Sequence, residues 1–402
     1  MTRRLWPWTL LCLALSVPLA WHLYHRRSGP PVVRFATFNV ALNRSEPGAL
    51  GRELRGGGSV AAKQLAEIVQ RAAPDVLLLC ELDHDAAGEA ARSFADEYLA
   101  VGQNGRHGIR YEFVYTAPVN TGDPSGVDID GDGAVGGPAD AFGYGGFPGQ
   151  YGMALLSRHP ILVEQVRTFR TLPWSAMPDA QRPANCADDV WGRLRLSSKS
   201  HWDVPIGIGT PGQGGSIVHV LCAHPTPPVF DGPEDRNGCR NHDEIRFWVD
   251  YLTPGRCGWI VDDVGGRGGL AADQPFVVLG DLNCDPVDGE ARRGALQQLL
   301  AHERVQDPQP RSGGAVSAAM QQFGANAQQQ GDPATDTGDF PDGVDPAAKD
   351  RGPGNLRVDY VLPARSFVVA RSGVFWPNAH EGGAALVGVS DHRLVFVDVR
   401  AR

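Results

Sequence analysis

The sequence lacks an excess of basic residues. Lysine and arginine total 37 against 46 aspartates and glutamates, which gives a net charge of −9 at pH 7. Proteins that bind nucleic acid over much of their surface usually carry a strong positive charge. The composition therefore excludes a general basic footprint, and only a local basic patch remains as a route to nucleic acid.

The sequence also lacks a CxxC pair and any cysteine and histidine spacing typical of structural zinc. Cys80 and Cys222 lie in apolar runs, so we expect buried free thiols there. Cys186, Cys239 and Cys257 stand among loop residues and are better candidates for disulfides, with the pairing left open.

No internal repeat and no break in composition divides the chain after its first 30 residues. Hydrophobic residues make up 42% of the chain and charged residues 21%, which is typical of a globular protein. We expect one domain over residues 31–402, with loop-rich insertions near residues 118–150, 197–215 and 306–354.

The first 30 residues differ from the rest. MTRR precedes an apolar run over residues 5–24, and HRR follows it. This pattern predicts export. No Ala-x-Ala cleavage site is evident, and about 20 apolar residues can span a bilayer. Residues 1–30 are therefore either a signal peptide or an N-terminal membrane anchor, and we expect a protein that is periplasmic, secreted or anchored through residues 5–24.

Polar side chains stand at or near one end of several apolar runs that are typical of strands. Glu81 follows VLLLC, His224 follows IVHVLCA, and Asp281 ends PFVVLGD. Asp359 lies within LRVDYVLP, and His392 precedes the last run, RLVFVDV. If the last strand runs antiparallel to a neighbour, these groups gather at one edge of a mixed sheet. Between the first two runs, Ser59 begins a predicted helix that ends before Pro74.

The segments at these strand ends follow a characteristic order. They are TFN (37–39), CELDHD (80–85), CAHP (222–225), GDLNCDP (280–286), RVDY (357–360) and SDH (390–392). Together they resemble the endonuclease/exonuclease/phosphatase superfamily over nearly the whole chain after residue 30. The resemblance implies an α/β (α+β) fold, a four-layer sandwich of two mixed, mainly antiparallel sheets packed face to face with helices outside. It also implies a hydrolase of phosphoester bonds.

The resemblance implies a magnesium or manganese site at Glu81 and Asp391, with Asn39 as a secondary ligand or phosphate contact. Hard oxygen ligands of this kind suit Mg²⁺. The alternative for Glu81 is a capping or salt-bridged carboxylate. An ionisable group directly after LLLC is costly unless it is paired or liganded, which favours the metal.

The resemblance also assigns the chemistry to five residues. Asp281 would orient or deprotonate the attacking water, and Asn283 would hold that water or a phosphate oxygen; turn formation is their alternative role. His392 would act as a general base or stabilise the phosphate, with Asp359 fixing its tautomer. His224 would donate to a phosphoryl oxygen, although a lone histidine in this position is more often a satisfied core residue.

Two further groups of residues have less specific patterns. Arg236, Arg240 and Asn241 are candidates to bind a substrate phosphate, and the equal alternative is the solvated start of a helix. Asp128, Asp130 and Asp132 have the spacing of an EF-hand loop, but position twelve is an alanine and no helical pattern flanks them. They form either a lone Ca²⁺ loop or a glycine-rich turn.

The substrate is less well defined than the chemistry. Cys284 follows the GDxN motif and Val358 precedes Asp359, which argues against the inositol phosphatase branch. An exported, acidic chain favours extracellular phosphodiesters, nucleic acid among them, or phosphomonoesters. The competing interpretations are a catalytically inactive binding protein on the same fold and a calcium-dependent binding protein. The sequence indicates neither a protein partner nor an oligomeric state.

Overall fold

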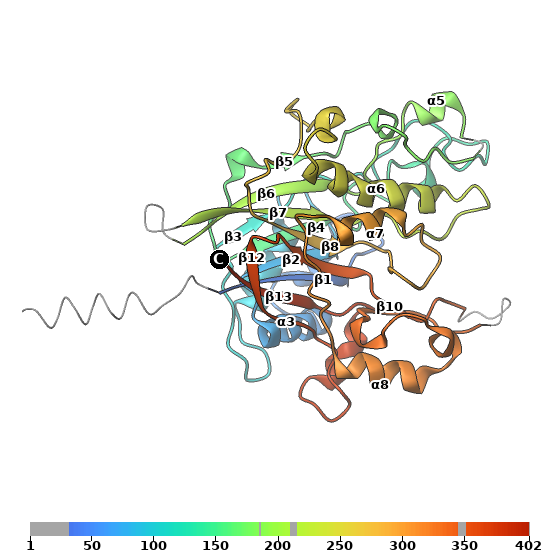
Figure 1. The fold of residues 1–402 in the computed structure, drawn as a ribbon. Coiled ribbons are helices and arrows are strands. Elements are labelled where there is room, and N and C mark those ends of the chain that lie inside the picture. The colour runs from blue at the N-terminus through green and yellow to red at the C-terminus, as the bar shows by residue number, and fades with distance from the viewer. Residues whose placement is uncertain (1–31, 185, 210–214, 345–350, 402) are drawn as a thin grey trace, which may run out of the picture.

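Two β-sheets contain nearly all the apolar runs of the sequence (Figure 1). The computed structural model describes residues 32–184, 186–209, 215–344 and 351–401. The first sheet consists of β1 (Val33–Leu42), β2 (Val76–Leu82), β3 (Phe113–Tyr115), β4 (Met153–Ser157), β12 (Phe367–Val374) and β13 (Val395–Ala401). The second consists of β5 (Arg167–Thr168), β6 (His201–Ile208), β7 (Ser216–Ala223), β8 (Phe276–Asp281) and β11 (Asp359–Pro363). A short ribbon pairs β9 (Gly338–Asp339) with β10 (Asn355–Leu356).

The helices lie outside the two sheets. They are α2 (Ala49–Leu54), α3 (Val60–Ala72), α4 (Glu89–Ser93), α5 (Asp188–Trp191), α6 (Arg236–Leu252), α7 (Gly294–Ala301) and α8 (Gly313–Gln322). In Figure 1, α6 and α7 cover one side of the stacked sheets and α3 covers the other. The four-layer sandwich that the sequence predicts is confirmed.

Each sheet is mixed. The strand orders are β12-β13-β1-β2-β4-β3 and β11-β8-β7-β6-β5. The pairs β1 with β2 and β7 with β8 are parallel, and the other neighbours in the two sheets are antiparallel. Parallel neighbours end at the same edge of a sheet. Asn39 and Glu81 therefore lie together on the first sheet, and His224 and Asp281 on the second.

The alternation of side chains along the central strands separates two apolar cores. Phe35 and Leu78 face the second sheet, in a cluster that continues through that sheet to α6. Their neighbours Ala36 and Leu77 face outward and pack with α3 and the segment after it. This period of two is what a strand covered on both faces requires.

Helix α3 begins and ends as its sequence predicts. The Ser59 hydroxyl accepts a hydrogen bond from the backbone N–H of Ala62, which is an N-cap. At the other end Ala73 adopts a left-handed conformation with φ of 51°, and its N–H bonds to the carbonyl of Val69. Pro74 follows, so the chain leaves the helix and enters β2.

The expected insertion near residues 197–215 is wrong over most of its length. Strand β6 occupies residues 201–208, and all of them except Gly207 are buried. The strand contains Pro205, although proline is rare inside sheets. Its carbonyl accepts from the N–H of Leu162, on the side away from β7. The N–H that proline lacks would point the same way, so the ladder with β7 loses nothing. Within the expected insertion 306–354, helix α8 was not anticipated.

The two predictions about the cysteines have different outcomes. The six cysteines in the described part of the chain are all free thiols. This confirms the interpretation of Cys80 and Cys222, which are fully buried. The preference of Cys186, Cys239 and Cys257 for disulfides is wrong. Cys239 is buried on α6, inside the core and not in a loop.

The predicted signal peptide or anchor over residues 1–30 lies outside the described residues. Among the helices that the structure does describe, none has the length and hydropathy needed to cross a membrane. The single domain over residues 31–402 stays a prediction.

Gly280 allows β8 to approach β7 directly before Asp281. A Cβ atom at this position would lie 2.0 Å from the carbonyl oxygen of Ala223, so the strands would have to separate. We expect Gly280→Ala to lower the free energy of unfolding by about 1–3 kcal/mol, the usual cost of overpacking, measured by thermal or urea unfolding. Gly388→Ala is the matched control, since no atom lies within 4 Å of its added Cβ. Equal stability of the two variants would contradict the close approach.

Candidate active site

Strained backbone conformations gather at the strand ends. Glu81, Asn283 and Tyr151 have φ angles of 57°, 50° and 55°, and Ala41, at an irregularity in the pairing of β1, has 47°. Positive φ is unfavourable for residues other than glycine, although asparagine tolerates it. Such conformations persist only where the surroundings impose them, and they are concentrated at functional sites. The backbone conformations alone therefore indicate a functional site at this edge of the sandwich.

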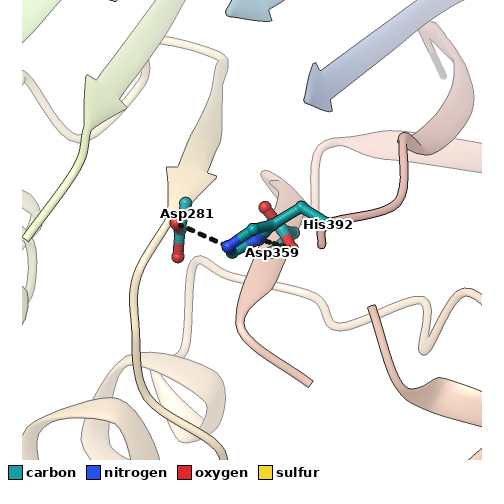
Figure 2. Close-up of side chains that lie close together, drawn as sticks. All are labelled: Asp281, Asp359 and His392. Atoms are coloured by element: carbon teal, nitrogen blue, oxygen red, sulfur yellow. Dashed lines mark hydrogen bonds and ion pairs between the residues drawn. The ribbon is translucent and has the colours of Figure 1, made fainter. Parts of the chain in front are cut away.

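Asp281, Asp359 and His392 form a buried triad at this edge (Figure 2). Nδ1 of His392 lies 2.9 Å from Asp359 Oδ2, and Nε2 lies 3.6 Å from Asp281 Oδ2. The imidazole therefore stands between two carboxylates that come from neighbouring strands, β8 and β11. The sequence interpretation predicted the contact between Asp359 and His392.

The two carboxylates keep His392 protonated. Burial has the largest single effect and lowers the pKa of the imidazole, but the charges of Asp359 and Asp281 together outweigh it and raise the pKa to about 10. At neutral pH the ring is a cation that donates through both nitrogens. Of the two roles considered for His392, this state fits the stabilisation of phosphate and does not fit a general base.

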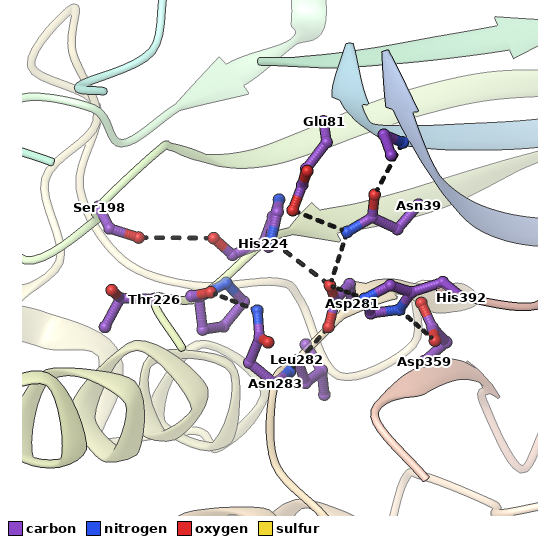
Figure 3. A network of polar contacts seen from close by, with 12 residues as sticks. Asn39, Glu81, Ser198, His224, Thr226, Asp281, Leu282, Asn283, Asp359 and His392 are labelled. Atoms are coloured by element: carbon purple, nitrogen blue, oxygen red, sulfur yellow. Dashed lines mark hydrogen bonds and ion pairs between the residues drawn. The ribbon is translucent and has the colours of Figure 1, made fainter. Parts of the chain in front are cut away.

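Asp281 is the centre of the polar network (Figure 3). Its Oδ2 accepts from Asn39 Nδ2 at 3.0 Å and lies 3.5 Å from His224 Nε2, and its Oδ1 accepts from the backbone N–H of Asn283 at 2.9 Å. Only 1% of the residue is exposed. Burial raises the pKa of Asp281 to about 6, against the opposing charge of His392. A carboxylate with this pKa can take up a proton near neutral pH.

Asn39 connects the two sheets. Besides its bond to Asp281, Nδ2 donates to Glu81 Oε1 at 3.1 Å, and Oδ1 accepts from the backbone of Ala41 at 3.2 Å. Asn43, which the sequence interpretation missed, donates to Glu81 Oε2 at 2.9 Å. No local pattern distinguishes Asn43 from an ordinary loop asparagine.

His224 is fully enclosed at the end of β7. Burial is the main reason why its pKa lies well below the ordinary value, and the cations Lys199 and His392 lower it further. The ring is therefore neutral. Within the described part of the chain its Nδ1 has no hydrogen-bond partner. His224 thus presents a neutral imidazole to Asp281, and its predicted hydrogen bond to a phosphoryl oxygen stays a prediction.

The insertion after β8 forms a wall beside His392. The hydroxyl oxygen of Thr337 accepts from the backbone N–H groups of Val358 and Asp359, at 3.0 and 2.9 Å, which fixes the start of β11. The backbone of Gly338 forms a bridge with His392, and the Phe340 ring meets the imidazole edge to face with centroids 5.4 Å apart. This low-complexity stretch is thereby part of the site.

The structure does not bring every predicted residue into this group. Asp391 is exposed, and its carbonyl accepts from the N–H of Asp339 at 2.8 Å. Among the described residues, the acidic and histidine ligand atoms that lie within 4.8 Å of one another at this edge belong to Asp281, Asp359 and His392. The expected metal ligands Glu81 and Asp391 are outside that group.

The side chains on α6 that were candidates for phosphate binding form hydrogen bonds to backbone carbonyls of neighbouring loops. The side chain of Arg240 donates to the three carbonyls of residues 195–197 at 2.9–3.0 Å. Asn241 Nδ2 donates to the carbonyls of Thr226 and Leu282, and Arg236 donates to the carbonyl of Ile129. These donors hold loops together, and the role of the three side chains in substrate binding stays a prediction.

The donor set fits a divalent cation. The two carboxylate oxygens of Glu81 accept only amide N–H groups among the described residues, from Asn39 and Asn43. Burial raises the pKa of Glu81, against the opposing effects of the Asn39 hydrogen bond and of the charges of His392 and Lys199. A second buried oxygen, Asp359 Oδ1, has no hydrogen-bond partner in the described part of the chain. Carboxylate and amide oxygens are the ligands that Mg²⁺ and Mn²⁺ prefer.

The aspartate loop is closed by its own backbone. Asp128, Asp130 and Asp140 place carboxylate oxygens within 4.8 Å of one another. Asp140 replaces Asp132 of the predicted set, and Asp132 instead accepts from the N–H of Ala134 at 2.7 Å. Asp140 also accepts from three backbone N–H groups. A glycine-rich turn explains these contacts without an ion, and calcium binding stays a prediction.

Comparisons with known proteins give the following findings. The model of the Endonuclease/Exonuclease/phosphatase family matches residues 36–392. Comparison with curated proteins finds no match. Similar solved structures include an endonuclease/exonuclease/phosphatase from Beutenbergia cavernae (20% identity, TM-score 0.48, covering 92% of this chain and 72% of that one). Another is a protein of that family from Bacteroides thetaiotaomicron (12% identity, TM-score 0.46, covering 93% of this chain and 100% of that one). A third is sphingomyelinase C from Streptomyces griseocarneus (15% identity, TM-score 0.44, covering 92% of this chain and 99% of that one).

Proposed function

Because the chain belongs to the endonuclease/exonuclease/phosphatase family, we propose that it hydrolyses a phosphoester by attack of water on phosphorus, with Mg²⁺ or Mn²⁺ bound. The observation that carries this proposal is the position of the Asp281 carboxylate. It is buried within hydrogen-bonding or ion-pair distance of Asn39, His224 and His392. Such a carboxylate, surrounded by donors at the edge of a strand, can deprotonate a water next to a phosphoryl group.

Asp281 would accept the proton of the attacking water, and Asn283 would orient that water. The amide Nδ2 of Asn283 donates to the carbonyl of Pro225 at 3.1 Å. This hydrogen bond fixes the orientation of the amide. Its Oδ1 would then accept a hydrogen bond from the attacking water. The backbone N–H of the same residue holds Asp281 Oδ1, so one residue positions both the base and the nucleophile.

The histidines would bind the phosphoryl oxygens. His392 is a cation at neutral pH and His224 is neutral, so each can donate a hydrogen bond through an N–H group to an oxygen that gains charge in the transition state. A divalent cation held by Glu81, with Asn39 and Asp391 as further ligands, would neutralise part of the same charge. The preferred substrates are phosphodiesters, nucleic acid included, and phosphomonoesters are the alternative.

We also propose that residues 1–30 direct the chain out of the cytoplasm. Export would bring the site to extracellular or periplasmic phosphoesters. The apolar run over residues 5–24 with basic residues on both sides supports this proposal. Detection of the protein in the periplasmic, secreted or membrane fraction would test it.

A screen of substrates and metals tests the enzymatic proposal. The purified protein would be incubated with Mg²⁺, Mn²⁺ or Ca²⁺ and with DNA, RNA, sphingomyelin, inositol phosphates, bis-p-nitrophenyl phosphate or simple monoesters. We expect metal-dependent hydrolysis of at least one diester. Hydrolysis confined to monoesters would overturn the preference for diesters. Binding without any turnover would favour the alternative, an inactive or calcium-dependent binding protein on the same fold.

Glu81→Gln should weaken the response to metal. The substitution keeps an acceptor for Asn39 but removes the charge that a cation requires. We expect the Mg²⁺ concentration for half-maximal activity to rise by about 10–100-fold, measured by metal titration. Glu89→Gln is the control, because Glu89 is half exposed and pairs with Arg55 at the surface. Unchanged metal dependence of the Glu81 variant would remove Glu81 from the metal site.

A further inference from the structure

Lys199 is a buried lysine that the catalytic scheme above does not use. It lies in the segment that leads into β6, and 6% of its surface is exposed. Its backbone carbonyl accepts from the N–H of Asn120 at 2.9 Å. Among the residues that the structure describes, its Nζ is not one of the fully enclosed side-chain nitrogens that lack a partner, so the ammonium group keeps contact with solvent although most of the residue is buried. A cation held in this way, with no ion pair to a described residue, calls for an explanation.

The segment around Lys199 is fixed against the His224 side of the site. Ser198 donates to Glu244 Oε1 through its N–H and its hydroxyl, at 2.6 and 2.9 Å, and Thr226 donates to Oε2 at 2.7 Å. Figure 3 shows Ser198 next to His224, where its hydroxyl reaches the histidine carbonyl at 3.5 Å. Glu244 thus obtains its hydrogen bonds from neighbours of Lys199 and not from the ammonium group itself.

The charge of Lys199 acts on the catalytic groups. Burial is the main influence on Lys199 and lowers its pKa, while Glu244, Glu81 and Asp281 oppose that effect. In return the ammonium adds to the lowering of the pKa of His224 and opposes the rise that burial causes in the pKa of Glu81. These influences agree with the position of the neighbouring Ser198, whose hydroxyl lies 3.5 Å from the carbonyl oxygen of His224.

We propose that Lys199 binds the phosphoryl group of the substrate, its ammonium donating to a non-bridging oxygen on the His224 side. The inference rests on the proposed function and adds a substrate contact to it. A lysine presents a compact positive charge that suits phosphate. In the free enzyme that charge forms no ion pair with a carboxylate of the described residues, and an anionic substrate supplies a direct partner. Inorganic phosphate should therefore occupy the same position as an inhibitor.

The proposal separates activity from stability. Lys199→Met keeps the length and apolar volume of the stem and removes a charge whose burial outweighs the attraction of Glu244, Glu81 and Asp281. We expect kcat/KM for the best diester of the screen to fall by about 10²–10³-fold. Inhibition by inorganic phosphate should weaken at least about tenfold, which corresponds to one lost charge-assisted contact. The melting temperature should stay equal or rise, and the Mg²⁺ titration should not change. Lys199→Arg should recover part of the phosphate affinity.

Two controls define the outcomes. Lys63→Met removes an exposed lysine of α3 and should leave all four measurements unchanged. If Lys199 instead serves as counter-ion of Glu244, Lys199→Met will lower the melting temperature and Glu244→Gln in the same chain will restore it together with activity. That result, or a Lys199→Met variant with wild-type kcat/KM and phosphate inhibition, overturns the proposal.

A phosphate-induced thermal shift keeps this inference distinct from the proposed function. Inorganic phosphate with Mg²⁺ should raise the melting temperature of the wild-type protein and not that of Lys199→Met. If the wild-type protein hydrolyses no phosphoester, the proposed function fails, while a shift that depends on Lys199 still supports the phosphate contact. An equal shift in the two proteins refutes it.

Discussion

Asp281→Asn should lower kcat/KM for phosphoester hydrolysis by about 10³-fold, within the range for loss of a general base. The asparagine occupies nearly the same volume and can still accept from Asn39, but it cannot take a proton from water. The measurement is steady-state kinetics on the best substrate of the screen, with Mg²⁺ at saturation.

The stability of this variant should not follow its activity. The folded-state pKa of Asp281 is about 6, above the value of about 3.9 for a free aspartate, so the folded protein binds this proton more tightly than the unfolded chain. The ionised carboxylate therefore opposes folding increasingly as pH rises from about 4 to 6, and the cost persists above that range. Removing the charge should leave the melting temperature at pH 8 unchanged or higher.

Asp83→Asn is the matched control for Asp281. Burial also raises the pKa of Asp83 to about 6, and its carboxylate accepts from the backbone N–H groups of Arg44 and Tyr151. Asp83 stands two residues after Glu81 but has no contact with the histidines. We expect activity within a few-fold of the wild type. A similar loss in both variants would mean that any buried charge change at this edge disturbs the site, and Asp281 would lose its special role.

Asp359→Asn should change the pH range in which the protein is active. Asp359 is the largest of the influences that raise the pKa of His392 to about 10. If the imidazolium is the active form, activity falls as pH rises through this pKa. Without the Asp359 charge the pKa drops, so the alkaline loss should begin near neutral pH. We also expect a decrease of about 10²-fold in kcat/KM at pH 8, within the range for loss of a positioned proton donor.

The measurement is a profile of kcat/KM against pH between 6 and 10.5. His392→Gln serves as the control, because its amide can donate but cannot titrate. It should lose the alkaline limb altogether. An alkaline limb that stays at the same pH in Asp359→Asn would show that His392 does not need to be protonated. Asp359 also affects stability through His392: the raised pKa of His392 favours folding most below about pH 6.5, and this contribution is lost as pH rises through 10.

The sequence predicted the strand ends because apolar runs and polar residues alternate there in a regular way. Glu81, His224 and Asp281 each end a continuous apolar run, and burial on both faces explains such runs. The contacts between these strand ends in space were harder to predict. Asn39 and Asp281 are separated by 242 positions yet share a hydrogen bond. No local pattern specifies such a contact, and only the order of six motifs indicated it.

The residues that escaped prediction act through loops or long side chains. Thr337 lies in a stretch rich in glutamine, glycine and aspartate, and its role depends on two backbone N–H groups of a distant strand. Lys199 stands between serines, a context that usually indicates a surface turn. Arg240 looked free because sequence spacing does not show which loop covers a helix face. Each of these three side chains owes its contacts to being buried or covered by a loop. The neighbouring residues in the sequence do not show whether a single polar residue is buried.

The bond from Asn39 to Asp281 has a consequence for how the rate can vary. The predicted metal ligand Glu81 belongs to one sheet and the proposed base Asp281 to the other, so the distance between them is set by the thickness of the apolar layer. Side chains such as Phe35 and Leu279, deep in that layer, therefore act as spacers for the reacting groups. An error of about 1 Å in such geometry can cost about 10²-fold in rate. Under the proposed function, substitutions in the apolar layer between the sheets should therefore change the rate of hydrolysis even where the substituted side chain touches no ligand.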